Sequence, residues 1–108
     1  MDVPEIDIAE AVRRIDAGTP VIDVRQPDEY VAGHVPGAPL IPLGDLPERV
    51  DEIPALGEVL VICHVGGRSA QAAGFLRRQG IDAINIAGGT KAWIEAGHPL
   101  AAGEQPGA

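Results

Sequence analysis

The sequence is poor in several residue types, and each shortage excludes a class of protein. It has one cysteine, which excludes an internal disulfide framework and fits a reducing compartment. No apolar run approaches the roughly 18 residues that a membrane-spanning helix needs. Tyrosine, phenylalanine and tryptophan occur once each. We therefore expect a protein without disulfides or membrane spans, in which Val, Ile, Leu and Ala fill the core.

Basic residues are also scarce. The chain has 8 Lys and Arg against 16 Asp and Glu, which gives a net charge of −8 and a pI of about 4.6. Nucleic acids and anionic membranes both attract basic surfaces, so we expect neither as a partner. The N-terminus lacks a basic region followed by an apolar core. We therefore expect no signal peptide and a cytoplasmic location.

The chain contains a regular alternation of strand and helix patterns. Short aliphatic runs between glycines and prolines predict strands at residues 20–25, 37–43, 57–63 and 82–89, the second confined by its prolines to a short or edge strand. Helical spacing, capping residues and glycine stops predict helices at residues 6–18, 27–33, 44–53, 68–80 and 90–97. This alternation is typical of an α/β domain with a parallel sheet, and strands of Val, Ile and Leu favour helices on both faces.

The chain is long enough for one core and too short for two. At 108 residues it has no internal repeat and no linker between domains. We expect one domain over residues 1–100. The remaining stretch, residues 101–108, is rich in small and polar residues and contains proline, and it is expected to be a disordered C-terminal tail.

The single cysteine lies where open α/β sheets gather functional groups, at the carboxyl end of a strand pattern. Cys63 ends the strongest strand pattern of the chain, and a helix pattern begins a few residues later. Gly66 and Gly67 allow the backbone to turn with its N–H groups aimed inward, and the following helix adds the positive end of its dipole. A thiol in this turn is expected to have a lowered pKa and to be a nucleophilic thiolate. Arg68 can add a positive charge.

A packing role for Cys63 is the competing interpretation. A lone cysteine at the end of an apolar strand is most often a small buried hydrophobe. Three further features, taken together, favour a catalytic role for Cys63 over a packing role. They are the Gly-Gly turn, the Arg-Ser start of the helix and the position at the strand end.

Three motifs, in order along the chain, resemble the signatures of the rhodanese (sulfurtransferase) family. The active-site loop of that family is similar to CHVGGRS, its N-terminal signature to VIDVRQPDEYVAGHVPGAPLIPL and its C-terminal signature to INIAGGTKAWIEAGHPL. The similarity covers nearly all of residues 7–100. It implies a rhodanese-like fold, with a central parallel sheet of about five strands and helices on both faces.

The resemblance also implies a reaction that needs no cofactor and no metal. Cys63 would be the catalytic nucleophile, which attacks the outer sulfur of an anionic donor such as thiosulfate and becomes a persulfide. The sulfur would then pass to a thiol, to cyanide in an assay or to a sulfur-accepting protein. Arg68 is the candidate for binding the anionic end of the donor. The residues implied for the active-site loop and for substrate binding are His64, Val65, Gly66, Gly67, Arg68 and Ser69.

Two alternatives stay open. Proteins of this fold can act as sulfur carriers or regulatory modules, which receive sulfur from a partner protein without turning over thiosulfate. Related phosphatases and arsenate reductases form the second alternative. Their loop between cysteine and arginine is longer and holds a tetrahedral phosphate, whereas only four residues separate Cys63 from Arg68. The shorter spacing favours sulfur transfer.

The other polar candidates are predicted to be structural. Asp23 and Arg25 end another strand pattern, and in the family the corresponding pair mainly fixes neighbouring loops through hydrogen bonds. His34 falls in a turn of the N-terminal signature, so we expect a structural role for it too. Three scattered histidines and one cysteine do not make a metal site.

Overall fold

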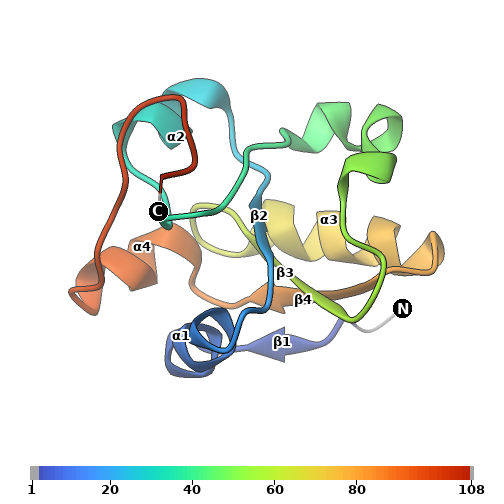
Figure 1. Cartoon of the computed structure of the whole chain (residues 1–108), viewed down its shortest axis with the longest axis horizontal. Helices are drawn as coiled ribbons and strands as arrows, with labels where there is room; N and C mark the ends of the chain where they lie inside the picture. The colour runs from blue at the N-terminus through green and yellow to red at the C-terminus, as the bar shows by residue number, and fades with distance from the viewer. Residues whose placement is uncertain (1–2, 108) are drawn as a thin grey trace.

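A four-stranded parallel sheet forms the centre of the structure, a computed structural model that describes residues 3–107 (Figure 1). The strands lie in the order β1-β4-β3-β2, and all neighbouring pairs are parallel. They are β1 (Glu5–Ile6), β2 (Val21–Asp23), β3 (Glu58–Ile62) and β4 (Asp82–Ile86). An isolated parallel bridge between Asp23 and Leu40 extends the sheet beyond β2, within the predicted edge strand. The predicted α/β fold is confirmed, with a sheet close to the expected five strands.

Helices cover both faces of the sheet. They are α1 (Ile8–Asp16), α2 (Pro27–Ala32), α3 (Gly67–Arg78) and α4 (Gly89–Glu95), together with the 3-10 helices η1 (Leu43–Glu48) and η2 (Val50–Glu52). Successive side chains of β3 point to opposite faces. Val59 and Val61 pack in a core cluster with α3 and η1, whereas Leu60 and Ile62 pack in a second cluster with α1 and α4. The strand is therefore buried on both sides, as its aliphatic composition predicts.

Two local features differ from the sequence expectations. Asp7 caps α1, as the sequence predicts, but Glu5 and Ile6 before it pair with β4 as a strand that the sequence does not predict. A strand of two residues is too short to produce a recognisable alternation. The predicted helix at residues 44–53 forms as two 3-10 segments. Pro47 lies inside the first of these and has no N–H to donate to a regular helix.

The C-terminal segment packs against the domain, whereas its composition predicts a disordered tail. Over residues 101–107 the chain passes the buried side chain of His34. Nε2 of His34 lies 3.0 Å from the carbonyl oxygen of Gln105 and 3.1 Å from that of Pro106. A buried polar partner from another part of the chain thus holds the segment, and composition does not reveal such a partner. The domain boundary before this segment stays a prediction, and the first two residues of the domain and Ala108 lie outside the described residues.

Candidate active site

Cys63 lies in a short turn that joins β3 directly to α3. The strand ends at Ile62 and the helix begins at Gly67, so four residues form the turn. Gly66 precedes the helix with a φ of +116°, a conformation that favours glycine. Cys63 itself is 1% exposed, whereas the two residues after it are exposed to solvent. The turn therefore has a buried sulfur and an open rim.

The sulfur of Cys63 accepts hydrogen bonds from the turn and from α3. The backbone N–H of Gly66 donates to it at 3.1 Å and the Ser69 hydroxyl at 3.2 Å. Burial raises the pKa of the thiol. Hydrogen bonds from the Ser69 hydroxyl and from the backbone N–H groups of Ser69, Gly66 and Val65 outweigh burial, so the pKa of Cys63 lies below its ordinary value. The environment therefore favours the nucleophilic thiolate.

The start of α4 holds the carbonyl side of the same turn. The N–H and the hydroxyl of Thr90 both donate to the Cys63 carbonyl, at 2.8 and 2.9 Å, and the N–H of Lys91 donates to the His64 carbonyl at 3.0 Å. Gly89 packs so closely that a Cβ there would lie 2.5–2.6 Å from these two carbonyl oxygens. Because α4 binds the carbonyl groups, the N–H groups of the turn can face the sulfur. Sequence reasoning gave Gly89 and Thr90 no role, although the glycine pair before the last helix pattern marks the contact.

Arg68 is paired with a carboxylate beside the turn. Its two terminal nitrogens donate to the two oxygens of Glu29 at 2.7 and 2.8 Å. The Arg68 guanidinium lowers the pKa of Glu29 to about 2, and Glu29 in turn raises the pKa of Arg68. Glu29 also accepts the backbone N–H of Gln26 at the start of α2, at 3.1 Å. Helix α2 thus supplies a counter-charge that the loop motif alone does not reveal.

A series of hydrogen-bonded side chains connects the sulfur of Cys63 to the interior of the sheet. The Ser69 Oγ lies 2.5 Å from Oδ1 of Asn85 as well as 3.2 Å from the sulfur of Cys63. Asn85 is fully buried in β4, and its Nδ2 donates to Glu5 in β1 at 2.8 Å and to the Gly66 carbonyl at 3.3 Å. Sequence reasoning assigned no role to Asn85 or Glu5. The signal for Asn85 is a polar residue inside an otherwise apolar strand.

At the end of β2, Asp23 and Arg25 form a closed pair. Nε and Nη2 of Arg25 donate to the carboxylate of Asp23 at 2.9–3.1 Å, and Nη2 also donates to the Gly33 carbonyl at 2.8 Å. Both side chains are buried, and their hydrogen bonds fix the turn after α2. His34 is buried nearby, stacked on Tyr30 with ring centroids 3.6 Å apart. The structural roles of Asp23, Arg25 and His34 stay predictions, and these contacts are the reason to keep them.

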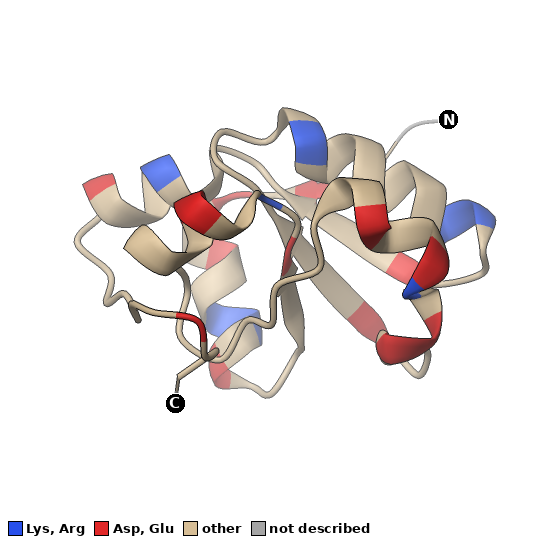
Figure 2. Cartoon of the chain, turned by 90° about the horizontal axis from the view of Figure 1, so that it is seen from above, with Lys and Arg blue, Asp and Glu red and all other residues tan. Residues whose placement is uncertain are grey.

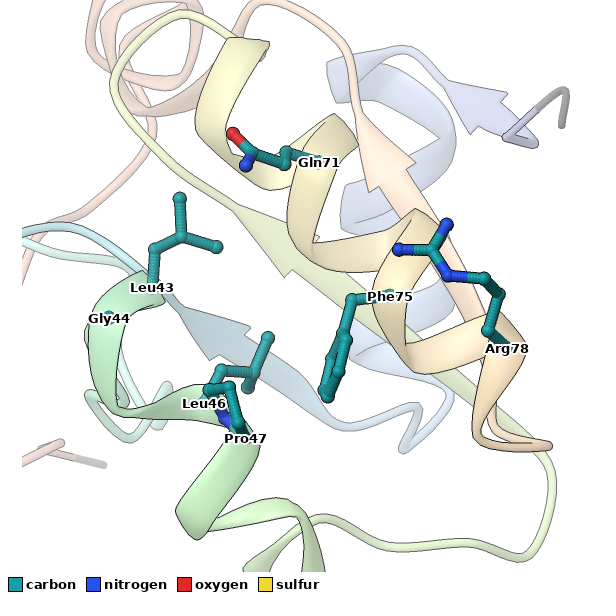
Figure 3. A pocket seen from close by; sticks show the side chains of 7 residues that line it. All are labelled: Leu43, Gly44, Leu46, Pro47, Gln71, Phe75 and Arg78. Atoms are coloured by element: carbon teal, nitrogen blue, oxygen red, sulfur yellow. The ribbon is translucent and has the colours of Figure 1, made fainter.

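A surface cavity of about 340 Å³ lies between η1 and α3 (Figure 3). Side chains from both elements line it, among them Leu43, Leu46, Phe75 and Arg78. Neither Cys63 nor any other residue of its turn belongs to this lining. The chemistry of the sulfur therefore depends on the turn itself and not on this cavity.

Acidic residues lie on several elements around the fold (Figure 2). Those on η1 and η2 are Asp45, Glu48, Asp51 and Glu52. Together with the net charge of −8, they repel an approaching anion. The hydrogen-bond donors of the turn must overcome this repulsion if the substrate is anionic.

Two further findings concern the described part of the chain. Over residues 3–107 the structure contains no group of three or more His, Cys, Asp or Glu residues arranged to hold a metal ion. Over the same range, none of the helices has the length and apolar character needed to cross a membrane.

One known protein family matches both the fold and the turn at Cys63. The model of the Rhodanese-like domain family matches residues 7–96. This range includes strands β2, β3 and β4 and the turn at Cys63, whereas β1 (Glu5–Ile6) lies just before it. The chain belongs to the rhodanese-like family. This confirms the resemblance that the three sequence motifs predict.

Similar proteins show what the rhodanese-like chain shares with its relatives. A protein of Allochromatium vinosum named "Sulfurtransferase" is 36% identical over 105 residues, which are 94% of this chain and 98% of that protein. A Bacillus subtilis protein named "Putative sulfur carrier protein YrkF" is 35% identical over 94 residues, and this chain spans only 51% of its length. The crystal structure of a rhodanese-related protein from Thermoplasma volcanium has a TM-score of 0.85 at 34% identity, covering 91% of this chain and 97% of that one. The chain is thus a single-cysteine member of the rhodanese-like family, and its relatives include proteins named as a sulfurtransferase and as a putative sulfur carrier.

Proposed function

We propose that this rhodanese-like domain transfers a sulfane sulfur from thiosulfate through a persulfide on Cys63. The supporting observation is the convergence of the Gly66 N–H and the Ser69 hydroxyl on the Cys63 sulfur, together with a lowered pKa of the thiol. Such donors stabilise negative charge on a thiolate and, after loading, on the persulfide. A cysteine that only fills space in the core needs no ring of donors.

The reaction has two steps that balance in atoms and charge. The Cys63 thiolate attacks the outer sulfur of thiosulfate, so that a bond forms between the two sulfurs. The bond from the outer sulfur to the sulfonate sulfur breaks, and its electron pair leaves with sulfite. In the second step an acceptor, cyanide or a thiolate, attacks the outer sulfur of the persulfide, and the Cys63 thiolate is regenerated as the leaving group.

The residues of the turn have separate roles in this proposal. The backbone N–H groups around Gly66 hold the persulfide, while the exposed residues His64, Val65 and Gly67 form the rim where donor and acceptor enter. Arg68 binds the anionic end of thiosulfate. Because Arg68 already holds Glu29, the donor must share the guanidinium with that carboxylate or displace it.

A sulfur-carrier role is the second candidate, and the Arg68–Glu29 pair favours it. The pair neutralises the Arg68 guanidinium, which a dianionic donor needs, on a chain whose net charge is −8. A persulfide presented by a partner protein carries less charge than thiosulfate and loses less by this neutralisation. The similarity to the named sulfur carrier of Bacillus subtilis is consistent with this role.

Turnover of thiosulfate with cyanide separates the two functions. An enzyme releases sulfite and thiocyanate over many cycles, and replacing Arg68 by alanine lowers its kcat/KM for thiosulfate about tenfold, because a charge-assisted contact is lost. The matched control is Arg78→Ala, on the same helix but in the lining of the separate cavity, which leaves turnover unchanged. Loading by a neutral organic persulfide without turnover of thiosulfate would show a carrier instead.

A further inference from the structure

The hydroxyl of Ser69 has one proton and two acceptors. Its Oγ lies 3.2 Å from the sulfur of Cys63 and 2.5 Å from Oδ1 of Asn85. A serine hydroxyl can donate only one hydrogen bond at full strength. The sulfur and the amide oxygen therefore compete for the same proton.

The neighbours of Asn85 fix which end of its amide faces Ser69. On the far side of the amide lie a carboxylate oxygen of Glu5 at 2.8 Å and the carbonyl oxygen of Gly66 at 3.3 Å. Both of these groups only accept hydrogen bonds, so the amide nitrogen must face them. The amide oxygen is consequently held toward the Ser69 hydroxyl, and Asn85 is fully buried in this position.

These hydrogen bonds stabilise the thiol form of Cys63 and the thiolate form to different extents. With a thiol, the S–H of Cys63 donates to Ser69 and the Ser69 hydroxyl donates to Asn85, so every proton in the chain has an acceptor. With a thiolate, the Ser69 hydroxyl turns to the sulfur and the amide oxygen of Asn85 loses its donor. A buried acceptor without a donor costs free energy.

We infer that Asn85, held in place by Glu5, is a positioning residue that competes with Cys63 for the Ser69 proton and so sets how much of the sulfur is ionised. Its importance for sulfur transfer rests on the proposed function, because the thiolate is the form that attacks the donor. Ser69 and Asn85 thus act on the sulfur in opposite directions. Ser69 stabilises the thiolate, and Asn85 stabilises the thiol.

Charged and titratable groups on the elements packed around the turn also act on the sulfur. They are His64 in the turn, Arg68 on α3, its partner Glu29 on α2, Asp23 with Arg25 at the end of β2, Lys91 on α4, and Glu5 on β1, which contacts Asn85. Replacing Asn85 by alanine leaves all of these charges in place. A change in the ionisation of Cys63 in that variant therefore reports the hydrogen-bond competition.

The test is the pH profile of Cys63 alkylation by iodoacetamide in the full chain, which needs no sulfur donor. In Asn85→Ala the midpoint moves to lower pH, so that the thiolate fraction at a fixed pH below the midpoint rises about threefold to tenfold, the value of one hydrogen bond. In Ser69→Ala the midpoint moves to higher pH. Adding Asn85→Ala to Ser69→Ala causes no further shift, because Asn85 acts only through the Ser69 hydroxyl.

A second variant keeps the test decisive if Asn85→Ala fails to fold. Glu5→Gln changes an exposed residue and allows the Asn85 amide to turn its nitrogen toward Ser69. The midpoint again moves to lower pH, and the part of this shift due to Asn85 disappears in the Ser69→Ala background, where only the change of charge remains.

An unchanged or raised midpoint in Asn85→Ala, or a shift that persists without the Ser69 hydroxyl, would overturn the inference. For Glu5→Gln, an equal shift with and without that hydroxyl would do the same. Failure of the proposed function has a different signature, since wild-type protein would then take up no sulfur from any donor, whatever the alkylation profile.

Discussion

The carboxyl ends of β2 and β3 are neighbours in the sheet, but their polar groups are arranged in different ways. At the end of β2, the Asp23 carboxylate and the Arg25 guanidinium satisfy each other, at 0% and 4% exposure. At the end of β3, backbone N–H groups and a hydroxyl converge on the single sulfur of Cys63, beside a rim that is open to solvent. The first arrangement stabilises the fold. The second can stabilise negative charge on a group that arrives from outside.

The largest expected effect of a substitution is on the closed pair. Asp23→Ala leaves the buried Arg25 guanidinium without its counter-charge, and we expect the free energy of unfolding to fall by about 3–5 kcal/mol. Urea unfolding measures this loss. Asp82→Ala, which removes the exposed partner of Arg77, is the control and should lower stability far less.

Sulfur loading of folded Asp23→Ala protein completes this test. If Asp23 is structural, the folded fraction takes up sulfur as the wild type does. A folded variant that does not load would put Asp23 in the active site and remove the contrast between the two strand ends.

The next effect concerns the glycine that supports the turn from the side of α4. In Gly89→Ala the new Cβ would lie 2.5–2.6 Å from two backbone carbonyl oxygens, at a φ of +59°. Because backbone must shift to accommodate it, we expect a loss of about 2–4 kcal/mol in the free energy of unfolding and slower loading of Cys63. The matched control is Gly44→Ala in η1, away from the turn, where a Cβ also meets nothing within 4 Å. Equal stability and loading in the two variants would contradict the supporting role of α4.

The smallest expected effect concerns the solvent-accessible ion pair of Arg68 and Glu29 beside the turn. The pKa of Glu29 lies at about 2 in the folded protein, below its ordinary value of 4.5. The pair therefore stabilises the fold above pH 4.5, and this contribution is lost as the pH falls from 4.5 toward 2. Since both side chains are about one third exposed, we expect Glu29→Gln to cost only about 1 kcal/mol at neutral pH.

Urea unfolding at several pH values tests whether the stabilisation by this ion pair is lost as the pH falls. The difference in unfolding free energy between wild type and Glu29→Gln should be constant near neutral pH and should narrow as the pH falls below 4.5. A difference that is the same at pH 3 and pH 7 would mean that the pair contributes through packing and not through charge.

The sequence predicts the turn well because its signals are local. The β-branched run before Cys63, the glycines after it and the helix pattern that follows all lie within one short segment. The Asp23–Arg25 pair is local too, since its partners are two residues apart. In these places, local propensity and the final structure agree.

The missed contacts are between distant segments, where no periodic signal exists. Arg68 and Glu29 are 39 residues apart, and Asn85 and Glu5 are 80 residues apart. The packing of the C-terminal segment on His34 spans a similar distance, 72 residues to Pro106. Such pairings depend on which strands become neighbours, and the order β1-β4-β3-β2 is visible only in the folded chain.

The most direct test of the account is the intact mass of the protein before and after incubation with thiosulfate or an organic persulfide, and again after cyanide. We expect a gain of one sulfur atom that cyanide removes, and no gain in Cys63→Ser. With thiosulfate as the only effective donor the protein is a thiosulfate sulfurtransferase, whereas loading by the persulfide alone indicates a carrier. No gain with either donor, or a gain that persists in Cys63→Ser, would contradict the central claim that Cys63 carries the transferred sulfur.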